Sequence, residues 1–536
     1  MDQKGNNQKD FEQLNCKIDK LTTSNSQLVL QVSELLNLNK KLHKENQRQS
    51  KEFQKETRIQ HKEFIKTING LKAVIKEKDA ELAKLREQLN KDSTNSSKPP
   101  STDFYKKPSP KPSTLNSRNA KGTVKKTNGG QKGHPGRTME LKEVPDAIER
   151  CLPKDCEECP LFGKCETTVS SSRNVIDLVI TTFQTKFDQV QCSCPKRGGA
   201  IIKGEFPVGV NSYFQYGNTV QSMAVSLSTF GMMSMSRITE TINALTGLSM
   251  SDATVSNMIL SCSDKCKEHL PELRKLLLDS HSIGFDETGI RVCGKNNWMH
   301  TASTSDLTLL VSSPKRGIPG IDDCNVLPHF KGVAVHDCWS SYYNEKYAGA
   351  THALCNAHID RELQGVDDNY KQRWAKQFQN LLMSMYVTKS KFLAEGVTKA
   401  PDKMLKDFSD QYDKIVASGI KRNPIPKVVK KSRGRPKKGT ARNLVDRLQK
   451  RKADVMRFFT DFKVPYSNNL AEKSFRLSKK KMQIAGTFRA SDGGERFATI
   501  FSIIDTCRKN GITSIEALSQ IFAGTFSFDF LKQPAG

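Results

Sequence analysis

The stretch that decides the fold is HSIGFDETGIRV, residues 281–292, an apolar run interrupted by the acidic pair Asp286 and Glu287. Two further β segments follow, NNWMHTAST at 296–304 and LTLLVSSP at 307–314, and a Gly-Lys-Asn-Asn turn is expected between the first two. GVAVHD at 332–337 indicates a fourth, buried strand, and the sequence after it has a helical pattern. Three β segments, a fourth strand and then helices predict an α/β core.

Three acidic residues occupy positions that suit a metal site in such a core. Asp286 lies midway along the first strand, Asp337 ends the fourth, and Glu472 falls in the first turn of a later helix that Asn468 or Asn469 caps. The spacings are 337−286=51 and 472−337=135 residues. An RNase H-like core has carboxylates at these three places, the first two on parallel neighbouring strands, and they hold two divalent ions. Mg²⁺ suits such a site because it prefers hard oxygen ligands.

Each acid taken alone has a simpler interpretation, since most acidic side chains lie at the surface or in salt bridges. Glu287, Asp360 and Glu495 are local competitors for a role at the site. An unpaired charge within an apolar strand is costly, so Asp286 needs either a partner or a function. The three acids are therefore significant as a group rather than one by one.

The chain is strongly basic, with 85 Lys and Arg residues against 57 Asp and Glu residues among 536, a formal net charge of +28. This excess repels itself unless a polyanion neutralises it, so nucleic acid is the expected partner, with a generally basic soluble surface as the alternative. The start, MDQKGNNQKD, is polar, and no stretch has the ~18 apolar residues of a membrane span. We therefore expect a soluble, intracellular, multidomain protein whose 14 cysteines are thiols or metal ligands.

Residues 1–92 are expected to form a coiled coil. Leucine recurs every seventh residue at Leu14, Leu21, Leu28, Leu35 and Leu42, and after a four-residue stutter a second seam follows at Ile68, Ile75, Leu82 and Leu89. Asn25 and Asn39 at a positions favour two strands. A parallel homodimer is the preferred interpretation, and an amphipathic helix packed on its own protein is the alternative.

The rest of the chain divides by composition and pattern. Residues 93–140 are a basic linker rich in Pro, Ser and Gly, which either lies along phosphates or acts as a passive tether; residues 141–205 contain six cysteines among β-like runs. Residues 206–278 are helical. Residues 279–370 form the first part of the core, 371–464 a basic helical insertion with a Pro/Lys/Arg-rich break at 423–439, 465–510 the second part of the core, and 511–536 a C-terminal tail.

Two helices in the region 206–278 have the pattern of a helix-turn-helix. They are SMSRITETINALTG at 234–247 and SDATVSNMILSC at 251–262, joined by a turn around Gly247, with Ser251 or Asp252 as the cap of the second. Many helix pairs that do not bind DNA look the same, so DNA reading here is one of two alternatives.

Seven further stretches occur along the chain: NSSKPPSTD (95–103), GGQKGHPGR (129–137), FDETGIRV (285–292), HDCWSSYY (336–343), HALCNAHIDREL (352–363), VPYSNNLAEKSFR (464–476) and AGTFRASDGGERF (485–497). In these stretches and their order, across most of residues 95–510, the chain resembles the transposases of the insertion-sequence-66 family. The resemblance implies a DDE catalytic triad on an RNase H-like fold, with Asp286 and Asp337 in the two Asp roles and Glu472 in the Glu role.

The resemblance also implies a reaction. Water attacks a phosphodiester at the element's end, and the freed 3′-OH then attacks target DNA, two in-line displacements that one site with two Mg²⁺ or Mn²⁺ ions serves. No nucleotide cofactor is needed, and the sequence has no Walker P-loop. The implied partners are element-end DNA, target DNA, further copies of the chain and accessory proteins of the same element. The implied location is the bacterial cytoplasm, on the nucleoid.

Members of the family commonly have a zinc-binding domain before the core, which implies a structural Zn²⁺ site in this region. The candidate ligands are a C-x-x-C pair, Cys156 and Cys159, and a C-x-C pair, Cys192 and Cys194, and free structural thiols are the alternative. The second pair departs from the usual C-x-x-C spacing, and Cys151 and Cys165 are extra, so the ligand set stays open.

Several basic residues are candidates for DNA contact. His358 and Arg361 match a family motif and either contact the scissile phosphate or support the metal ligands, and a structural histidine is equally compatible. Arg433 and Arg435 belong to an RGRP segment like the core of an AT-hook, for which nonspecific phosphate contact is the preferred interpretation. The helix of Glu472 also carries Arg476, Lys479, Lys480 and Lys481, which either bind phosphates or form a solvated face.

Two other functions remain open at this level. One is a non-catalytic DNA-binding protein that uses the zipper, the cysteines and the linker without cutting DNA. The other is a different RNase H-like nuclease, such as a resolvase. Strand joining at specific DNA ends distinguishes a transposase from both.

Overall fold

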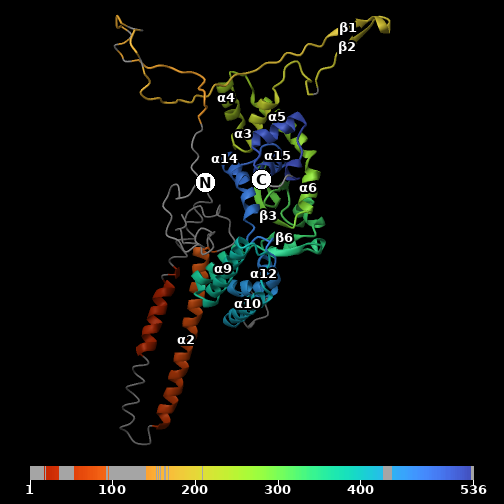
Figure 1. Ribbon diagram of the computed structural model, residues 1–536. Helices are drawn as coiled ribbons and strands as arrows, with labels where there is room; N and C mark the ends of the chain where they lie inside the picture. The colour runs from red at the N-terminus through yellow and green to blue at the C-terminus, as the bar shows by residue number, and fades with distance from the viewer. Residues whose placement is uncertain are drawn as a thin grey trace. The chain divides into compact units, whose positions relative to one another are not determined.

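The computed structural model describes residues 17–34, 54–91, 95, 141–425 and 438–532, apart from isolated positions within these ranges. It is a mixed helical and sheet protein (Figure 1). The chain divides into two compact units, one of residues 1–120, 216–235 and 253–536 and the other of residues 121–215 and 236–252. Among the helices described, none combines the length and the hydropathy that a membrane crossing requires. Nearly all of the linker at 93–140, three leucines of the repeat (Leu14, Leu35 and Leu42), and Arg433 and Arg435 lie outside the described residues.

A five-stranded mixed sheet forms the centre of the first unit. Its strands are β3 (Ser282–Val292), β4 (Lys295–Ser303), β5 (Thr308–Ser313), β6 (Val333–His336) and β7 (Thr351–Leu354), in the order β5-β4-β3-β6-β7. β3, β4 and β5 pair antiparallel, whereas β6 pairs parallel with both β3 and β7. The four segments expected to be strands are confirmed. The short strand β7 was not predicted, because four residues carry too little pattern to separate a strand from the helix that follows.

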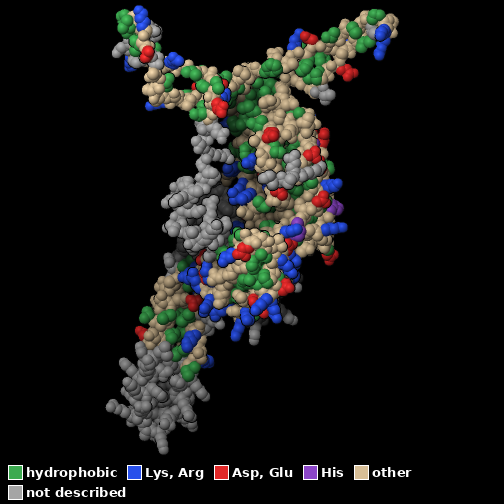
Figure 2. Space-filling view, in the orientation of Figure 1, with side chains coloured by type: hydrophobic (Ala, Val, Ile, Leu, Met, Phe, Trp, Pro, Cys, Tyr) green, Lys and Arg blue, Asp and Glu red, His purple; other side chains and the backbone are tan. Residues whose placement is uncertain are grey.

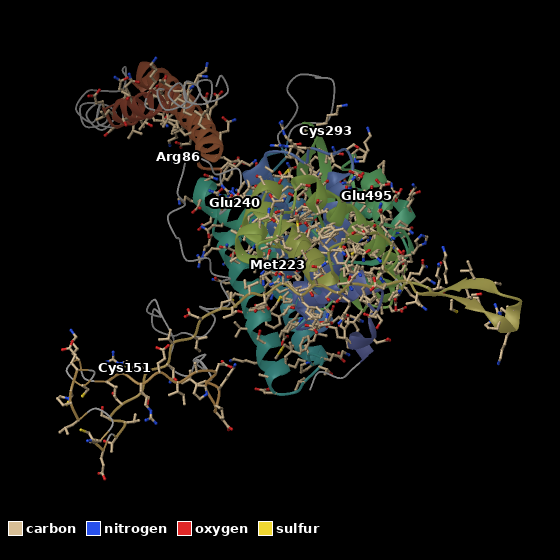
Figure 3. The ribbon with its side chains drawn as sticks, turned by 90° about the horizontal axis from the view of Figure 1, so that it is seen from above. Arg86, Cys151, Met223, Glu240, Cys293 and Glu495 are labelled. Carbon is tan, nitrogen blue, oxygen red and sulfur yellow. The ribbon has the colours of Figure 1, made fainter. Side chains whose placement is uncertain are left out.

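The hairpin between β3 and β4 turns at Cys293 and Gly294 rather than at the expected Gly-Lys-Asn-Asn. Val292 pairs with Lys295, so only two residues lie between the strands. Both have positive φ, 49° at Cys293 and 73° at Gly294, which is the geometry of a type I′ turn, whose twist matches that of the strands it joins. Cys293 lies at the outer end of this hairpin (Figure 3). The expected turn was wrong because residues 295–297 extend the ladder instead.

The free edge of β5 is covered by α15 (Gly493–Lys509). The hydroxyl of Ser502 accepts the backbone N–H of Leu310 at 2.8 Å, and the hydroxyl of Thr506, one turn later, accepts that of Thr308 at 3.0 Å. Side chains four residues apart lie on one face of a helix, so the two hydroxyls meet alternate donors of the strand. Such pairing stops an edge strand from recruiting another chain.

The segment between β7 and the helix of Glu472 is a helical subdomain with its own core. It consists of α8 (Asn356–Tyr370), α9 (Arg373–Ala394), α10 (Asp402–Arg422), α11 (Thr440–Lys450) and α12 (Lys452–Thr460). Their apolar faces share one cluster around Phe378, Tyr412 and Phe459, each buried. Lys and Arg side chains gather over the surface of these helices (Figure 2), as expected for a basic helical insertion.

Other helices complete the first unit. They are α3 (Asn218–Thr229), α5 (Asp252–Lys267), α6 (Leu270–Leu278), α7 (Ile318–Cys324), α13 (Asn469–Ser474), α14 (Arg476–Ala485) and α16 (Ser514–Ala523), with short 3-10 turns at Leu327–His329, Ser340–Tyr343, Glu345–Tyr347 and Asp529–Lys532. Within the segment 511–536, expected to be a C-terminal tail, the described residues include α16, whose apolar face packs against α3 and α15. Glu472 and the basic residues after it were expected on one helix, but Phe475 separates α13 from α14.

The N-terminal segment contains two helical stretches, residues 17–34 and α2 (Gln54–Asn90). Ile68 and Leu82, both at predicted seam positions, are only 9% and 7% exposed. The Asn25 side-chain amide donates to Asp79 Oδ1 at 3.3 Å, so this seam residue has a partner helix within its own chain. At its far end α2 contacts α8, where Glu87 accepts hydrogen bonds from Tyr370 and Thr440. Dimerisation through the coiled coil stays a prediction.

The second unit contains an antiparallel hairpin and most of α4. The hairpin consists of β1 (Gln191–Cys194), a 3-10 turn (Pro195–Arg197) and β2 (Ala200–Lys203), the only strands among the described residues of 141–205. The two helices expected around Gly247 exist as α4 (Met235–Thr246) and α5, and Gly247 has a φ of 71°. Their reading of DNA stays a prediction.

Lys389 of α9 generates a prediction about stability and pH. Lys389 is only 6% exposed. Its Nζ donates to the carbonyls of Phe458 at 3.0 Å and Val464 at 2.6 Å. Burial lowers the pKa of Lys389 to about 8, from an ordinary value of 10.5. The unfolded chain therefore binds more protons between these values, so stability should rise with pH across this window, by up to roughly 3 kcal/mol.

We expect urea unfolding at pH 7.5 and pH 10 to show this rise in the wild type and a smaller rise in Lys389→Met, which removes the titrating group. The difference between the two proteins isolates Lys389, because all other groups are shared. An equal pH dependence in both would contradict the assignment.

Candidate active site

Asp286 and Asp337 are neighbours because of the register between two parallel strands. β3 and β6 pair Ser282 with Val333, Ile283 with Ala334 and Gly284 with Val335, a constant offset of 51 residues. Asp337 also follows Asp286 by 51 residues, so the same register continued by two steps sets the two acids side by side. Adjacent strands are about 4.8 Å apart, and the charge of Asp337 contributes to the raised pKa of Asp286.

Glu472 reaches the same place on α13, which packs against β3 and β4. The close approach depends on Gly284, two residues before Asp286 and therefore on the same face of β3. A Cβ at Gly284 would lie 2.2 Å from Asn468 Oδ1 and 3.4 Å from the Cβ of Ala471. The absence of a side chain at Gly284 thus makes room for the helix that carries the third acid.

Asn468 ties this helix to the sheet. Its side-chain amide donates to the Phe285 carbonyl of β3 at 2.6 Å, and its backbone N–H donates to Cys355 Sγ at 3.2 Å. Of the two expected cap residues, Asn468 and Asn469, the N-cap of α13 is Asn468. Its side chain makes no capping hydrogen bond. The side chain is used instead to fix α13 against the strand of Asp286.

The electrostatics of the three acids are those of crowded anions. Burial raises the pKa of Asp286 well above its ordinary range, and the charges of Glu287, Glu472 and Asp337 raise it further. Burial, followed by the charge of Glu287, raises the pKa of Asp337 to about 6. Burial also raises the pKa of Glu472. Each carboxylate therefore costs free energy as an anion in this position.

Cationic side chains surround the acids and offset part of this cost. Arg361 Nη2 lies 3.8 Å from Glu472 Oε1, and Arg476 also lowers the Glu472 pKa. Arg316 and Arg447 lower the pKa of Asp337. Lys479 of α14 is close enough that the Asp286 charge raises its pKa, although burial has the larger, lowering effect.

The site fits hard divalent cations. Asp286 Oδ1 accepts the backbone N–H of Glu287 at 2.9 Å and Asp337 Oδ1 that of Trp339 at 3.0 Å, bonds that orient the carboxylates and leave further oxygen lone pairs. Burial is the main cause of the raised pKa values, and the charge of Glu287 adds to it at both Asp286 and Asp337. Oxygen-only, negatively charged sites of this kind are what Mg²⁺ and Mn²⁺ prefer.

The competing acids have partners of their own. Glu287, whose side chain is only 3% exposed, binds Arg316 at 2.8 Å and accepts the hydroxyl of Tyr342 at 2.7 Å. Asp360 accepts the side-chain amide of Gln379 at 2.9 Å, and Glu495 pairs with Lys267 at 3.1 Å. These contacts account for all three acids in structural terms.

The candidate DNA-binding residues differ in their surroundings. His358 and Arg361, on the first turns of α8, lie 3.7 and 3.8 Å from Glu472 Oε1, and burial lowers the pKa of His358 to about 3. Arg476 and Lys480 are exposed on α14. Lys481 donates to the carbonyls of Ser228 and Met233 at 3.1 and 3.2 Å, which favours a structural role for it.

The cysteines expected to bind zinc lie in the second unit. Cys156 and Cys159 are partly exposed, Cys192 on β1 is exposed, and the side chain of Cys194 is outside the described part. Among the described side chains, the one group of three potential ligands within reach of a single ion is elsewhere, at Cys355, His358 and Glu472. The zinc site in residues 141–205 stays a prediction.

Some residues of the site were not found from the sequence. Arg316 lies in a loop, with its guanidinium stacked between the rings of Trp298 and Trp339 at 4.9 and 4.5 Å. Arg447, from the helical insertion, lines a cavity of about 170 Å³ beside Asp337. Neither has a local signal, because each reaches the site from a segment distant in sequence.

The contact by which Asn468 holds α13 against β3 generates a prediction about stability. Asn468→Ala leaves the Phe285 carbonyl without its side-chain donor and the helix without its tie, which should cost about 1–3 kcal/mol of unfolding free energy. Asn469→Ala, at the exposed next position, should change it by less than about 0.5 kcal/mol. Urea titration of both variants measures the difference, and equal effects would show that Asn468 does not hold the helix.

Comparison with known families identifies models that match parts of the chain. A model described as a family of unknown function (DUF6444) matches residues 44–140. No curated protein matches the chain. The model of the Transposase IS66 family matches residues 215–496, more than half of the 536 residues, and the match includes Asp286, Asp337 and Glu472. This protein therefore belongs to the IS66 family of transposases.

Proposed function

We propose that the protein is a DDE transposase that cleaves DNA at element ends and joins them to target DNA on an RNase H-like core. The observation that carries the proposal is the approach of Glu472 and Asp337 to Asp286. Burial raises the pKa of Asp286 most, and the charges of Glu287, Glu472 and Asp337 raise it further. The strand order and the mixture of parallel and antiparallel pairs are those expected of an RNase H-like sheet. Membership of a transposase family supports the same activity.

In this mechanism Asp286, Asp337 and Glu472 would hold two divalent cations, Mg²⁺ or Mn²⁺. When bound, these ions would stabilise the charge on the attacking and leaving oxygens of an in-line displacement at phosphorus. The protein's own part is to orient the carboxylates through the backbone N–H groups of Glu287 and Trp339.

The neighbouring cations have a separate part. Arg361 and Arg476 flank Glu472, and Lys479 lies near Asp286, so phosphates that reach the acids also meet positive charge. The exposed Lys480 extends this charge along α14. We propose these four residues as the DNA contacts closest to the reacting phosphate. Contacts from Arg433 and Arg435 remain part of the proposal for the insertion.

Other parts of the proposal rest on sequence pattern. They are homodimerisation through the N-terminal coiled coil, zinc binding by Cys156, Cys159, Cys192 and Cys194, use of accessory proteins of the element, and action on the nucleoid of the bacterial cytoplasm. The alternatives are a non-catalytic DNA-binding protein and a different RNase H-like nuclease. The convergence of the acids disfavours the first, and strand joining separates the proposal from the second.

Strand transfer by purified protein tests the proposal directly. With Mg²⁺ and labelled element-end DNA, the wild type should join ends to target DNA, and Asp286→Asn should lower the rate by at least about 100-fold while retaining DNA binding. Glu495→Gln, a surface acid paired with Lys267, is the matched control and should keep its activity. End binding without cleavage by the wild type, with the element's accessory proteins present, would favour the non-catalytic alternative. Cleavage without joining would favour a nuclease.

Thermal unfolding gives a test that needs no DNA. Mg²⁺ at 100 times its dissociation constant should stabilise the wild type by about 2.7 kcal/mol, seen as a rise in Tm. Because the raised pKa of Asp337 means that its charge is destabilising above about pH 6, Asp337→Asn should raise the metal-free Tm and abolish the response to Mg²⁺. A metal-free Tm that falls in this variant would contradict the electrostatic description of the site.

A further inference from the structure

A second group of potential ligands shares Glu472 with the proposed active site. Cys355 Sγ, His358 Nδ1 and a Glu472 carboxylate oxygen all lie within 4.8 Å of one another. His358 Nδ1 lies 3.7 Å from Glu472 Oε1. A thiol, an imidazole and a carboxylate form a mixed set, unlike the oxygen-only set of Asp286 and Asp337.

The local structure presents Cys355 and His358 to one point. Cys355 is the N-cap residue of α8, and His358 follows three positions later, so both side chains lie on the same face of the first turn. Cys355 Sγ accepts the backbone N–H of Asn468, as thiolate sulfurs in metal sites commonly accept backbone donors. The fifteen-residue helix α8 also directs the positive end of its dipole at the sulfur.

Two independent observations indicate that a ligand is missing from this arrangement. The Nδ1 atom of His358 is buried and has no hydrogen-bond partner among the described residues, a costly state for a polar atom. Cys355 and His358 also line the cavity of about 170 Å³ beside Asp337. The cavity therefore adjoins two of the three candidate ligand residues.

The chemistry of the three atoms selects a class of ion. Thiolate and imidazole ligands favour Zn²⁺ and similar transition metals over Mg²⁺. Tetrahedral zinc at 2.0–2.3 Å from its ligands separates them by about 3.3–3.7 Å, so the three atoms need to close by about 1.5 Å at most. With three protein ligands, the fourth position would be left for water.

We propose that Cys355, His358 and Glu472 form a transition-metal site that is distinct from the Mg²⁺ site and withdraws Glu472 from it. Binding of Zn²⁺ by the three side chains would release the thiol proton of Cys355 to solvent and commit a Glu472 oxygen to zinc. Under the proposed function, on which this consequence rests, Zn²⁺ would then inhibit DNA cleavage in the presence of Mg²⁺.

Arg361 is one of the cationic groups that oppose this ion. Arg447, which acts on His358, and Arg476, which acts on Glu472, oppose it as well. The Arg361 guanidinium lies 3.8 Å from Glu472 Oε1, so zinc would have to share or displace an existing positive charge. DNA phosphate near Arg361 would draw the guanidinium away from Glu472. The site should therefore bind transition metal more weakly than a site with no competing cation, and Arg361→Gln should tighten it.

Cobalt(II) absorption tests the site without reference to DNA. The full chain is titrated with Co²⁺, whose tetrahedral thiolate complexes absorb in the visible and show a sulfur charge-transfer band. The wild type should bind one more Co²⁺ with this signature than Cys355→Ser, and His358→Gln should weaken that ion by at least about 100-fold. Cys338→Ser is the matched control, because Cys338 lines the same cavity but is outside the cluster.

A difference spectrum between wild type and Cys355→Ser cancels any ion held by the cysteines of residues 141–194. If Cys355→Ser fails to fold, His358→Gln alone decides, since its side chain is partly exposed. Identical Co²⁺ stoichiometry and affinity in the wild type and both variants would overturn the site.

Inhibition is measured separately, by DNA cleavage in Mg²⁺ with added Zn²⁺. Cys355→Ser should need at least about 10-fold more Zn²⁺ than the wild type for the same inhibition. Co²⁺ binding that depends on Cys355, together with equal Zn²⁺ sensitivity in both proteins, would overturn the inhibitory role. Because the absorption measurement does not use DNA, failure of the metal site and failure of the proposed function give different results.

Discussion

The parallel pairing of β3 with β6 is the constraint on which the rest of the site depends. Its register pairs Gly284 with Val335 and, continued by two steps, sets Asp286 beside Asp337. A slip of one residue would turn every side chain of β6 to the opposite face, removing the acid from the site and the fully buried Val335 from its cluster. The same β3–β6 register therefore fixes both the packing of the apolar residues and the position of the acids.

The site is built at a cost to stability. Asp286, Asp337 and Glu472 have raised pKa values, so each is less stable as an anion here than in water. Proteins commonly accept such a cost where a bound ion offsets it. The surrounding arginines reduce the cost without removing it, which leaves the carboxylates available to a stronger cation. Glu287 shows the contrast, since Arg316 and Tyr342 satisfy it fully.

Glu472 is held in place by contacts from several directions. Gly284 leaves room for α13, Asn468 ties that helix to β3, and the same Asn468 donates to the sulfur of Cys355. Glu472 therefore lies near Asp286, whose pKa its charge raises, and near the thiol and imidazole at the start of α8. A side chain with two possible sets of partner ligands is a natural point of competition between hard and soft metals.

The sequence by itself determined the strands β3 to β6, the helices of the insertion, and the helices α4 and α5, because these follow from local hydrophobic period. It also singled out Asp286, Asp337 and Glu472, whose roles belong to the proposed function. It did not predict the two-residue turn at Cys293, the short strand β7, the break at Phe475 or the helix α16, where neighbouring elements override weak local signals.

The tertiary structure alone decided which side chains meet. It brought Arg316 and Arg447 to Asp337, satisfied Lys481 with backbone carbonyls, gave Asn468 its tie to Phe285, and grouped Cys355 and His358 with Glu472. These contacts join residues that are tens or hundreds of positions apart. Local pattern reports the conformation of a segment, whereas such contacts depend on the packing of distant segments, which no short stretch of sequence encodes.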